Sequence, residues 1–366
     1  MEFSAEARLI HTGTARAIGS PVGPALTLTS TYVSHGVHDP SLPAYGRNTN
    51  PGWQDVEHAL AVIEGEGCQA VVFSSGQAAA MALMLTLSEG RERLVMLDDG
   101  YYKLRNLATK LRPHGVEVVT VDLLDLDAVE TAIGAGPSVL WGETPTNPLL
   151  RVADLAGLSA LADAAGTPFV VDNTVATALQ QKPLEFGALA SVYSLTKSLS
   201  GHSDVLGGAV VTRSAELAES LRAWRGTGGA ILGPFESWLV LRGLKTLPLR
   251  LERQSQNALA VVEFLERHPR VTAVHYPDGP LVKTQMPNGA GCLLAFELSG
   301  TVADADAVVA AARLIVPSTS FGGVESTWER RARWAAETAP DTLIRIGTGV
   351  EPAADIIADL SQALRA

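Results

Sequence analysis

Seven short apolar runs alternate with helical patterns between residues 70 and 212, and this rhythm constrains the fold more than any other feature. The runs cover residues 71–73, 94–97, 116–121, 139–141, 169–171, 192–193 and 209–211. Strands that alternate with helices indicate βαβ units and a mostly parallel sheet. Because the runs lack polar alternation, we expect helices on both faces of the sheet. Functional side chains are then expected at the carboxyl ends of the strands.

The segments on either side of this block have a different character. Residues 1–50 are rich in Thr, Ser, Pro and Gly and show little periodicity, which predicts an extended arm. Apolar residues recur at helical spacing before Pro269 ends the run, namely Leu251, Ala258, Leu259, Val262 and Leu265. This long helix is expected to lead into a smaller α+β unit with strands near 292–298 and 343–346. The predicted domains are therefore 1–50, 51–235 and 236–366.

Composition favours a small-molecule role. The chain has 366 residues, 46% of them hydrophobic, and a formal charge of -11. This charge disfavours nucleic acid and anionic membrane surfaces as partners, because phosphate binding needs positive faces. Residues 67–88 carry no charge, but the polar residues at 74–77 interrupt them. We therefore expect a buried strand followed by a helix there, and no membrane span.

Cysteine and histidine usage points to the cytoplasm and away from a metal site. Cys68 and Cys292 are too few for a disulfide framework, and residues 1–10 contain no apolar core of a signal peptide. His35, His38 and Asp39 lie in a loop flanked by Pro and Gly without a further cluster of ligands. We expect a cytoplasmic protein that binds no metal.

Two segments have the chemistry of an anion site and of a charge partner. Residues 74–78, Ser-Ser-Gly-Gln-Ala, stand between a strand and a helix, where free N–H groups could bind a phosphate. A simple turn is the alternative. Asp172 ends an apolar strand, where it could pair with a protonated ring nitrogen. Capping of the next helix is its alternative.

Two further segments could supply an amine and an aromatic ring. Lys197 follows a buried strand and has hydroxyl neighbours but no acid in its own segment. It could therefore lose its proton easily and form an imine, although an exposed structural lysine would look the same. Tyr101 follows another strand and could stack on a flat cofactor or pack in the core.

These four segments follow one another along a chain that resembles the family of cystathionine γ-lyase, cystathionine γ-synthase and methionine γ-lyase, which are pyridoxal-phosphate enzymes. The resemblance covers nearly the whole chain. The matching motifs lie at 45–47 with 50–51, 75–76, 143–148, 171–174, 194–197, 201–204, 242–247 and 320–326.

The resemblance implies a pyridoxal-phosphate fold of type I, with a mostly parallel seven-stranded sheet and a smaller α+β C-terminal domain. It implies that Lys197 and Tyr101 are catalytic: Lys197 as Schiff-base lysine and proton shuttle, Tyr101 as the stacking ring. Asp172 would pair with the pyridine nitrogen. The cofactor phosphate would be held by a set of small polar residues, and the substrate by a second set. The first set is Gly76, Gln77, Ser194 and Thr196, and the second is Asn147, Ser320 and Arg345, whose guanidinium would bind the substrate carboxylate.

The resemblance also implies shared sites and a class of reaction. Tyr45 and Arg47 of the arm would reach into the neighbouring subunit and bind the phosphate of its cofactor, so the site would need a dimer. The resemblance also favours the pairing of dimers into tetramers. The expected activity is carbon–sulfur lysis of a sulfur amino acid such as cystathionine. Two alternatives stay open: γ-replacement on an activated homoserine, and β-elimination.

Three departures from the family pattern bear on the substrate. Lys103 stands where methionine γ-lyases carry a cysteine after the stacking tyrosine, which argues against methionine as the main substrate. Thr319 replaces a glutamate found in many γ-lyases and γ-synthases. Glu329, Arg330, Arg331 and Arg333 form a charged run. We interpret this run as a solvated face, with recognition of an acidic distal group as the alternative.

Overall fold

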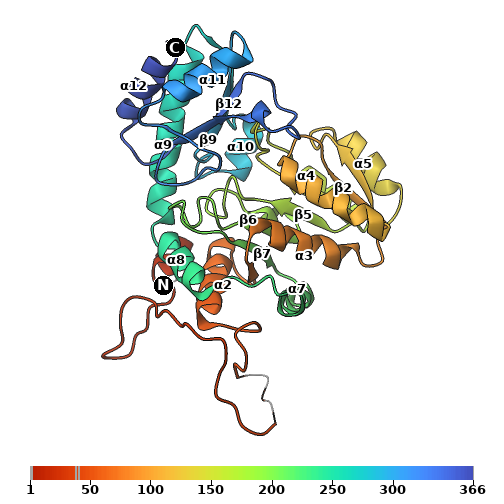
Figure 1. Cartoon of the computed structure of the whole chain (residues 1–366). Helices are drawn as coiled ribbons and strands as arrows, with labels where there is room; N and C mark the ends of the chain where they lie inside the picture. Colours follow the sequence, from red (N-terminus) through yellow and green to blue (C-terminus); the bar gives the residue numbers. More distant parts are fainter. Residues whose placement is uncertain (1–2, 38, 40–41, 366) are drawn as a thin grey trace.

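Two β-sheets organise the chain in this computed structural model, which describes residues 3–37, 39 and 42–365 (Figure 1). The larger sheet has seven strands in the order β1-β7-β6-β5-β4-β2-β3. Strand β7 is antiparallel to β1 and β6, and the other neighbouring pairs are parallel. The predicted mostly parallel seven-stranded sheet is confirmed. Its strands are β1 Gln69–Phe73, β2 Arg93–Leu97, β3 Glu117–Val121, β4 Ser138–Glu143, β5 Phe169–Asp172, β6 Ala190–Ser194 and β7 Gly208–Thr212.

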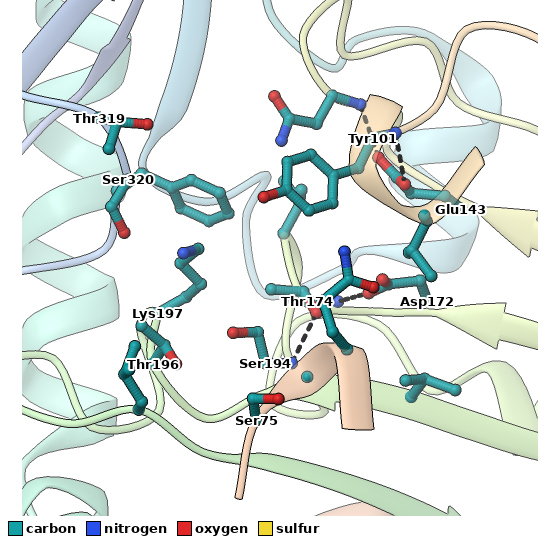
Figure 2. Close-up of a pocket in the computed structure, with 18 of the residues that line it drawn as sticks. Ser75, Tyr101, Glu143, Asp172, Thr174, Ser194, Thr196, Lys197, Thr319 and Ser320 are labelled. Atoms are coloured by element: carbon teal, nitrogen blue, oxygen red, sulfur yellow. Dashed lines mark hydrogen bonds between the residues drawn. The ribbon is translucent and has the colours of Figure 1, made fainter. Parts of the chain in front are cut away.

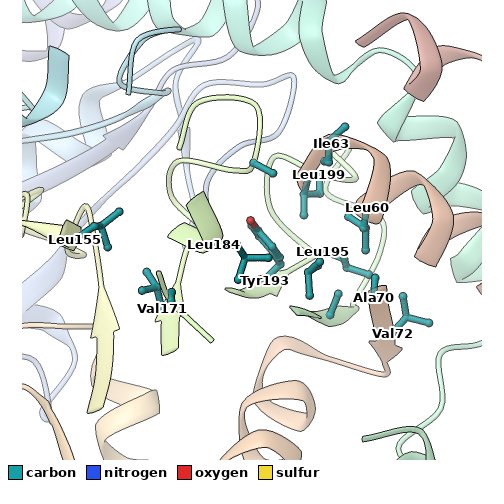
Figure 3. Close-up of a cluster of buried hydrophobic side chains, with 14 of the residues drawn as sticks. Leu60, Ile63, Ala70, Val72, Leu155, Val171, Leu184, Tyr193, Leu195 and Leu199 are labelled. Atoms are coloured by element: carbon teal, nitrogen blue, oxygen red, sulfur yellow. The ribbon is translucent and has the colours of Figure 1, made fainter. Parts of the chain in front are cut away.

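Helices cover both faces of this sheet, as the apolar strands predict. Successive strand residues point to opposite faces, so Val72 packs in one apolar cluster and Val71 in another. Figure 3 shows the first cluster, in which Leu60 and Leu155 of two helices pack with strand residues such as Val171. The first cluster is covered by α2 Pro51–Glu64, α5 Leu126–Gly134 and α6 Leu155–Ala164, and the second by α3 Gly76–Ser88, α4 Tyr102–Ala108 and α7 Ala215–Gly228. Short 3-10 helices lie at Thr109–His114 (η1) and Pro183–Phe186 (η2).

Side-chain caps explain where several of these helices begin. Asn50, Ser75, Asp125, Asp154 and Ser214 each accept a hydrogen bond from a backbone N–H in the first turn of the helix that follows. A cap of this kind stabilises a helix by about 1 kcal/mol. The caps therefore fix the loops at the strand ends as well as the helices.

The C-terminal part builds a second core around a five-stranded sheet with the order β10-β11-β12-β9-β8. The predicted long helix is confirmed as α9 Leu247–Glu266, whose Ala258 and Leu265 pack on Phe296 of the sheet. Leu259 is 58% exposed, however, because it lies on the other side of the helix. The strands are β8 Val271–His275, β9 Leu293–Leu298, β10 Val316–Pro317, β11 Thr327–Arg330 and β12 Leu343–Gly347. The remaining helices are α8 Pro234–Leu244, α10 Pro280–Gln285, α11 Val302–Ala311, η3 Arg331–Arg333 and α12 Ala353–Ala363.

The N-terminal segment extends away from both sheets (Figure 1). After α1 Ala5–Ile10, its described residues up to Asn50 form neither helix nor strand, apart from one bridge between Thr31 and Tyr45. Apolar side chains such as Ile18, Val33 and Val37 are exposed along it. His38 lies outside the described residues. Within the ranges that are described, no helix is long and apolar enough to cross a membrane.

Candidate active site

A cavity of about 200 Å³ at the carboxyl ends of the central strands brings together ten of the twelve predicted site residues (Figure 2). The large domain and the C-terminal part both contribute to its wall. The predicted residues in this wall are Gly76, Gln77, Tyr101, Asn147, Asp172, Ser194, Thr196, Lys197, Ser320 and Arg345.

One side of the cavity is formed by the start of α3. Ser75 caps this helix by accepting from Ala78 N at 3.1 Å, and the N–H groups of the first turn point out of the helix. A Cβ on Gly208 would lie 2.2 Å from the Ser75 carbonyl oxygen, so glycine allows this close approach. Ser194 and Thr196 add hydroxyls beside the helix start (Figure 2). The arrangement suits an anion.

Two carboxylates stand at neighbouring strand ends. Asp172 closes β5 and Glu143 closes β4, and the two residues are in register. Burial raises the pKa of Asp172, and hydrogen bonds from Thr174 offset part of this rise. Burial and the neighbouring Asp172 raise the pKa of Glu143. Asp172 accepts from Thr174 N at 3.0 Å, so it stabilises the local turn and also faces the cavity.

Lys197 points into the cavity from the loop after β6 (Figure 2). Burial and the positive charge of Arg345 lower the pKa of Lys197 to about 8. The exposed structural lysine considered above is therefore wrong. Arg250 holds the loop from behind, since it donates to the carbonyl oxygens of Ser198 at 2.7 Å and Gly243 at 2.8 Å.

Tyr101 lies at the start of α4 with its ring in the cavity wall (Figure 2). Its backbone N–H donates to Glu143 Oε2 at 2.9 Å, and Glu143 Oε1 accepts from Asn147 N at 2.8 Å. One buried carboxylate thus fixes the backbone of two predicted site residues. Burial raises the pKa of Tyr101 to about 12, so the phenol stays neutral.

The C-terminal part contributes a buried arginine. Arg345 on β12 donates to Asn147 Oδ1 at 2.8 Å and to the Ser320 carbonyl oxygen at 3.1 Å. Ser320 has a φ of 85°, a strained conformation for a residue with a side chain, of the kind that collects at functional sites. Burial and the nearby Arg331 lower the pKa of Arg345 to about 10.

The charged run at 329–333 is not a solvated face. The side chains of Glu329 and Arg331 are 1% and 2% exposed and form an ion pair at 2.7 Å. Glu329 lies on β11 and Arg331 begins η3 just after the strand, whereas Arg330 between them pairs with the more exposed Asp306. The interpretation fails for these two residues because the strand continues into a buried turn.

Tyr45 and Arg47 do not line the cavity of their own chain. Both are exposed, with the Arg47 guanidinium 5.3 Å from the centre of the Tyr45 ring. Arg47 Nη1 donates to the Gly226 carbonyl oxygen. Their predicted role in a neighbouring subunit stays a prediction.

Sequence reasoning gave no site role to Glu143 and Arg250, and it interpreted Glu329 as part of a solvated charged run. The signal for Glu143 was present, because it ends an apolar strand just as Asp172 does. Arg250 and Glu329 lie on an ordinary helix and strand, and only their burial marks them. Within the described residues, no group of three or more His, Cys, Asp or Glu side chains could hold a metal ion.

The cavity fits pyridoxal phosphate. The start of α3 and its hydroxyl neighbours suit the phosphate, Asp172 suits the ring nitrogen, Tyr101 offers a ring face and Lys197 an amine. Gln77 Oε1 is buried and finds no partner within the described part of the chain, so the amide is available to an outside group. A charged, phosphorylated aromatic aldehyde would satisfy each of these groups.

Comparison with known proteins agrees with the geometry. A Streptomyces coelicolor protein with a provisional cystathionine gamma-lyase name is 42% identical over 89% of this chain and 85% of its own length. The cystathionine gamma-synthase of Mycobacterium tuberculosis is 39% identical over 87% and 86%. The crystal structure of a methionine gamma lyase from Micromonospora echinospora superposes with a TM-score of 0.91 at 38% identity, covering 99% of both chains. The family model of the Cys/Met metabolism PLP-dependent enzymes matches residues 6–365. The chain belongs to this family, and its cofactor is pyridoxal phosphate.

Proposed function

We propose that the protein is a carbon–sulfur lyase that acts on a sulfur amino acid such as cystathionine. The reaction would be an α,γ-elimination that yields cysteine, 2-oxobutanoate and ammonia. The observation that carries the proposal is the grouping of Lys197, Asp172 and Arg345 in one cavity, with the pKa of Lys197 lowered to about 8. Lys197 supplies an amine that can accept a proton, Asp172 a charge partner for the ring nitrogen, and Arg345 a binding group for the substrate carboxylate.

Each side chain has a task that follows from its position. Arg345 would bind the substrate carboxylate with the N–H groups that Asn147, Ser320 and Glu329 leave free, and Asn147 would orient the same end. Lys197 would hold the cofactor covalently. When the substrate amine takes its place, the free amine of Lys197 would take up and return protons at the substrate carbons. Tyr101 would cover the ring face and keep water away. Bound pyridoxal phosphate supplies the electron sink for the charge that forms when the α-proton leaves.

A transfer reaction is the second candidate. In γ-replacement on an activated homoserine, the γ-substituent would leave and an incoming thiol would bond to Cγ in its place, and Lys197 would move the protons in both reactions. Thr319, where many γ-lyases and γ-synthases carry a glutamate, gives a reason to keep β-elimination as a further candidate. A protein that binds the cofactor without catalysis is disfavoured by the complete set of Lys197, Asp172, Tyr101 and Arg345.

Product identification separates these candidates. Purified protein would be incubated with cystathionine, homocysteine, cysteine and O-acylhomoserines, the last with and without a thiol. We expect a 2-oxo acid and ammonia from cystathionine. A new thioether from the acylhomoserine would instead establish replacement. Pyruvate in place of 2-oxobutanoate would establish β-elimination, and no turnover with bound cofactor would favour the non-catalytic role.

We also infer that the active sites are shared between subunits of a dimer, and that dimers pair into tetramers. The exposed apolar side chains of the 1–50 arm and the free position of Tyr45 and Arg47 outside their own cavity support this inference. The large and C-terminal domains would be 51–235 and 236–366. Cys68 and Cys292 are free thiols, in keeping with the expected cytoplasmic location.

Replacing Arg47 by alanine is expected to weaken cofactor retention, because a phosphate would lose a cationic partner. The measurement is the cofactor content after dialysis. Mixing this variant with the Lys197→Ala protein should restore part of the activity, since a hybrid dimer contains one site with both side chains. Arg16→Ala, which removes a charge from the same exposed arm, is the control and should retain its cofactor. Absence of rescue in refolded mixtures would contradict shared sites.

A further inference from the structure

Glu329 forms the centre of a buried charge cluster behind Arg345. It lies on β11 directly opposite Arg345 on β12, and its side chain is 1% exposed. Its Oε1 accepts from Arg345 Nη2 at 2.8 Å and from Arg331 Nη1 at 2.7 Å. Its Oε2 accepts from the indole N–H of Trp334 at 3.0 Å. This carboxylate therefore has well-formed partners on both oxygens.

The cluster is close to neutral, which explains how it can be buried. Arg331 Nη2 donates to Glu337, whose side chain is also 1% exposed, so two guanidinium groups face two carboxylates. Arg333 approaches Glu329 from the outer side at 3.5 Å and is 44% exposed. Burial disfavours a charged Glu329, but Arg345 and Arg331 together keep its pKa below the usual value. A buried charge that lost its partner would be strongly destabilised.

Thr319 belongs to the same arrangement. Its hydroxyl donates to Glu329 Oε1 at 3.0 Å. A carboxylate at position 319 would face the carboxylate of Glu329 at close range, and like charges in a buried site repel each other. The threonine at position 319 is therefore compatible with a buried, charged Glu329, whereas a glutamate at 319 would not be.

We propose that Glu329 is the positioning residue of the substrate-carboxylate site, and that Arg331 and Glu337 brace it so that Arg345 is oriented before the substrate arrives. The inference rests on the proposed role of Arg345 as the carboxylate clamp. Nη2 of Arg345 is held by Glu329 and the Ser320 carbonyl oxygen, and Nη1 by Asn147. With both ends of the guanidinium anchored, the substrate meets a donor set in fixed geometry, which lowers the cost of ordering it on binding.

The test is Glu329→Gln, which keeps the shape and one acceptor but removes the charge. We expect KM for amino-acid substrates to rise about tenfold while kcat stays within about twofold, because the affected group binds the carboxylate and not the reacting carbons. Binding of two unreactive probes, followed through the absorbance of the cofactor, provides a second readout. The affinity for L-alanine should fall by the same factor, and the affinity for propan-1-amine, which lacks a carboxylate, should not change.

Three further variants make the result decisive. Arg333→Gln removes an exposed cation from the same carboxylate and should leave both probes unaffected. Glu329→Gln/Arg333→Gln removes one charge of each sign and leaves Arg331, which lines the cavity, in place, so it serves if the single variant does not fold. Its KM should remain elevated. A return to the KM of the unmodified protein would show that only charge balance matters and would overturn the proposal, as would equal weakening of both probes.

The Arg345→Ala variant distinguishes a wrong assignment of the carboxylate site from a wrong role for Glu329. If its KM and L-alanine affinity match those of the unmodified protein, Arg345 does not bind the carboxylate and the site assignment itself fails. If Arg345→Ala weakens L-alanine binding but Glu329→Gln does not, only the positioning role of Glu329 is wrong.

Discussion

Replacing Lys197 by alanine is expected to abolish both turnover and the covalent attachment of the cofactor. Lys197 is the lysine in the cavity wall, and burial together with Arg345 lowers its pKa to about 8, so more of the amine is neutral at neutral pH than in an ordinary lysine. A neutral amine is the form that attacks an aldehyde. The absorbance near ~420 nm that is typical of a lysine-bound pyridoxal group should therefore disappear. No other side chain in the cavity wall could replace this amine.

Borohydride trapping provides the direct check on the attachment. Treatment of the unmodified protein should fix the cofactor to the peptide that contains Lys197, and mass spectrometry of the digest locates it. Lys110→Ala, a change at an exposed lysine of η1, is the matched control and should keep colour, trapping and activity. If the Lys197→Ala protein retains the absorbance band, the amine is supplied elsewhere and the proposed chemistry is wrong.

The sheet and its active edge could be predicted from the sequence because each strand is a short apolar run. Two buried faces require apolar residues at successive positions, and this is visible without any structure in runs such as 139–141 and 169–171. The carboxyl ends then follow from the direction of the chain, which is why Asp172 and Lys197 could be assigned to one edge. Leu259 shows the limit, because helical spacing alone does not tell which side of a helix faces the core.

The charge cluster could not be predicted in the same way. The sequence Glu-Arg-Arg-Ala-Arg at 329–333 is charged at every position but Ala332, and charged runs usually lie in solvent. Burial is compensated by nearby partners such as Arg331 and also by Arg345 across the sheet, which local composition does not reveal. Pairing across strands depends on register, which local composition does not fix. Glu143 could have been assigned from its place at the end of an apolar strand, but its partners, the backbone N–H groups of Tyr101 and Asn147, follow only from the fold.

Replacing Arg345 by alanine is expected to raise KM strongly with a smaller effect on kcat. The guanidinium is 3% exposed in its side chain, and a substrate carboxylate bound to it would be removed from water. Loss of one partner of such a pair costs about 2–5 kcal/mol, which corresponds to an increase in KM of about 30-fold to several thousandfold. Steady-state kinetics over a wide range of substrate concentrations would measure it.

The size of this effect also distinguishes binding from folding. Removing Arg345 takes one of two buried cationic partners from Glu329, which keeps Arg331, Arg333, Trp334 and Thr319, so we expect a lower melting temperature as well. Arg330→Ala, which breaks the neighbouring pair with Asp306 on the outer side of β11, should cost little in either measurement because that pair is partly solvated. If KM of the Arg345→Ala protein were unchanged despite intact cofactor absorbance, the substrate carboxylate would have to bind elsewhere in the cavity. If the loss of activity instead followed the loss of folded protein at each temperature, Arg345 would be a structural residue.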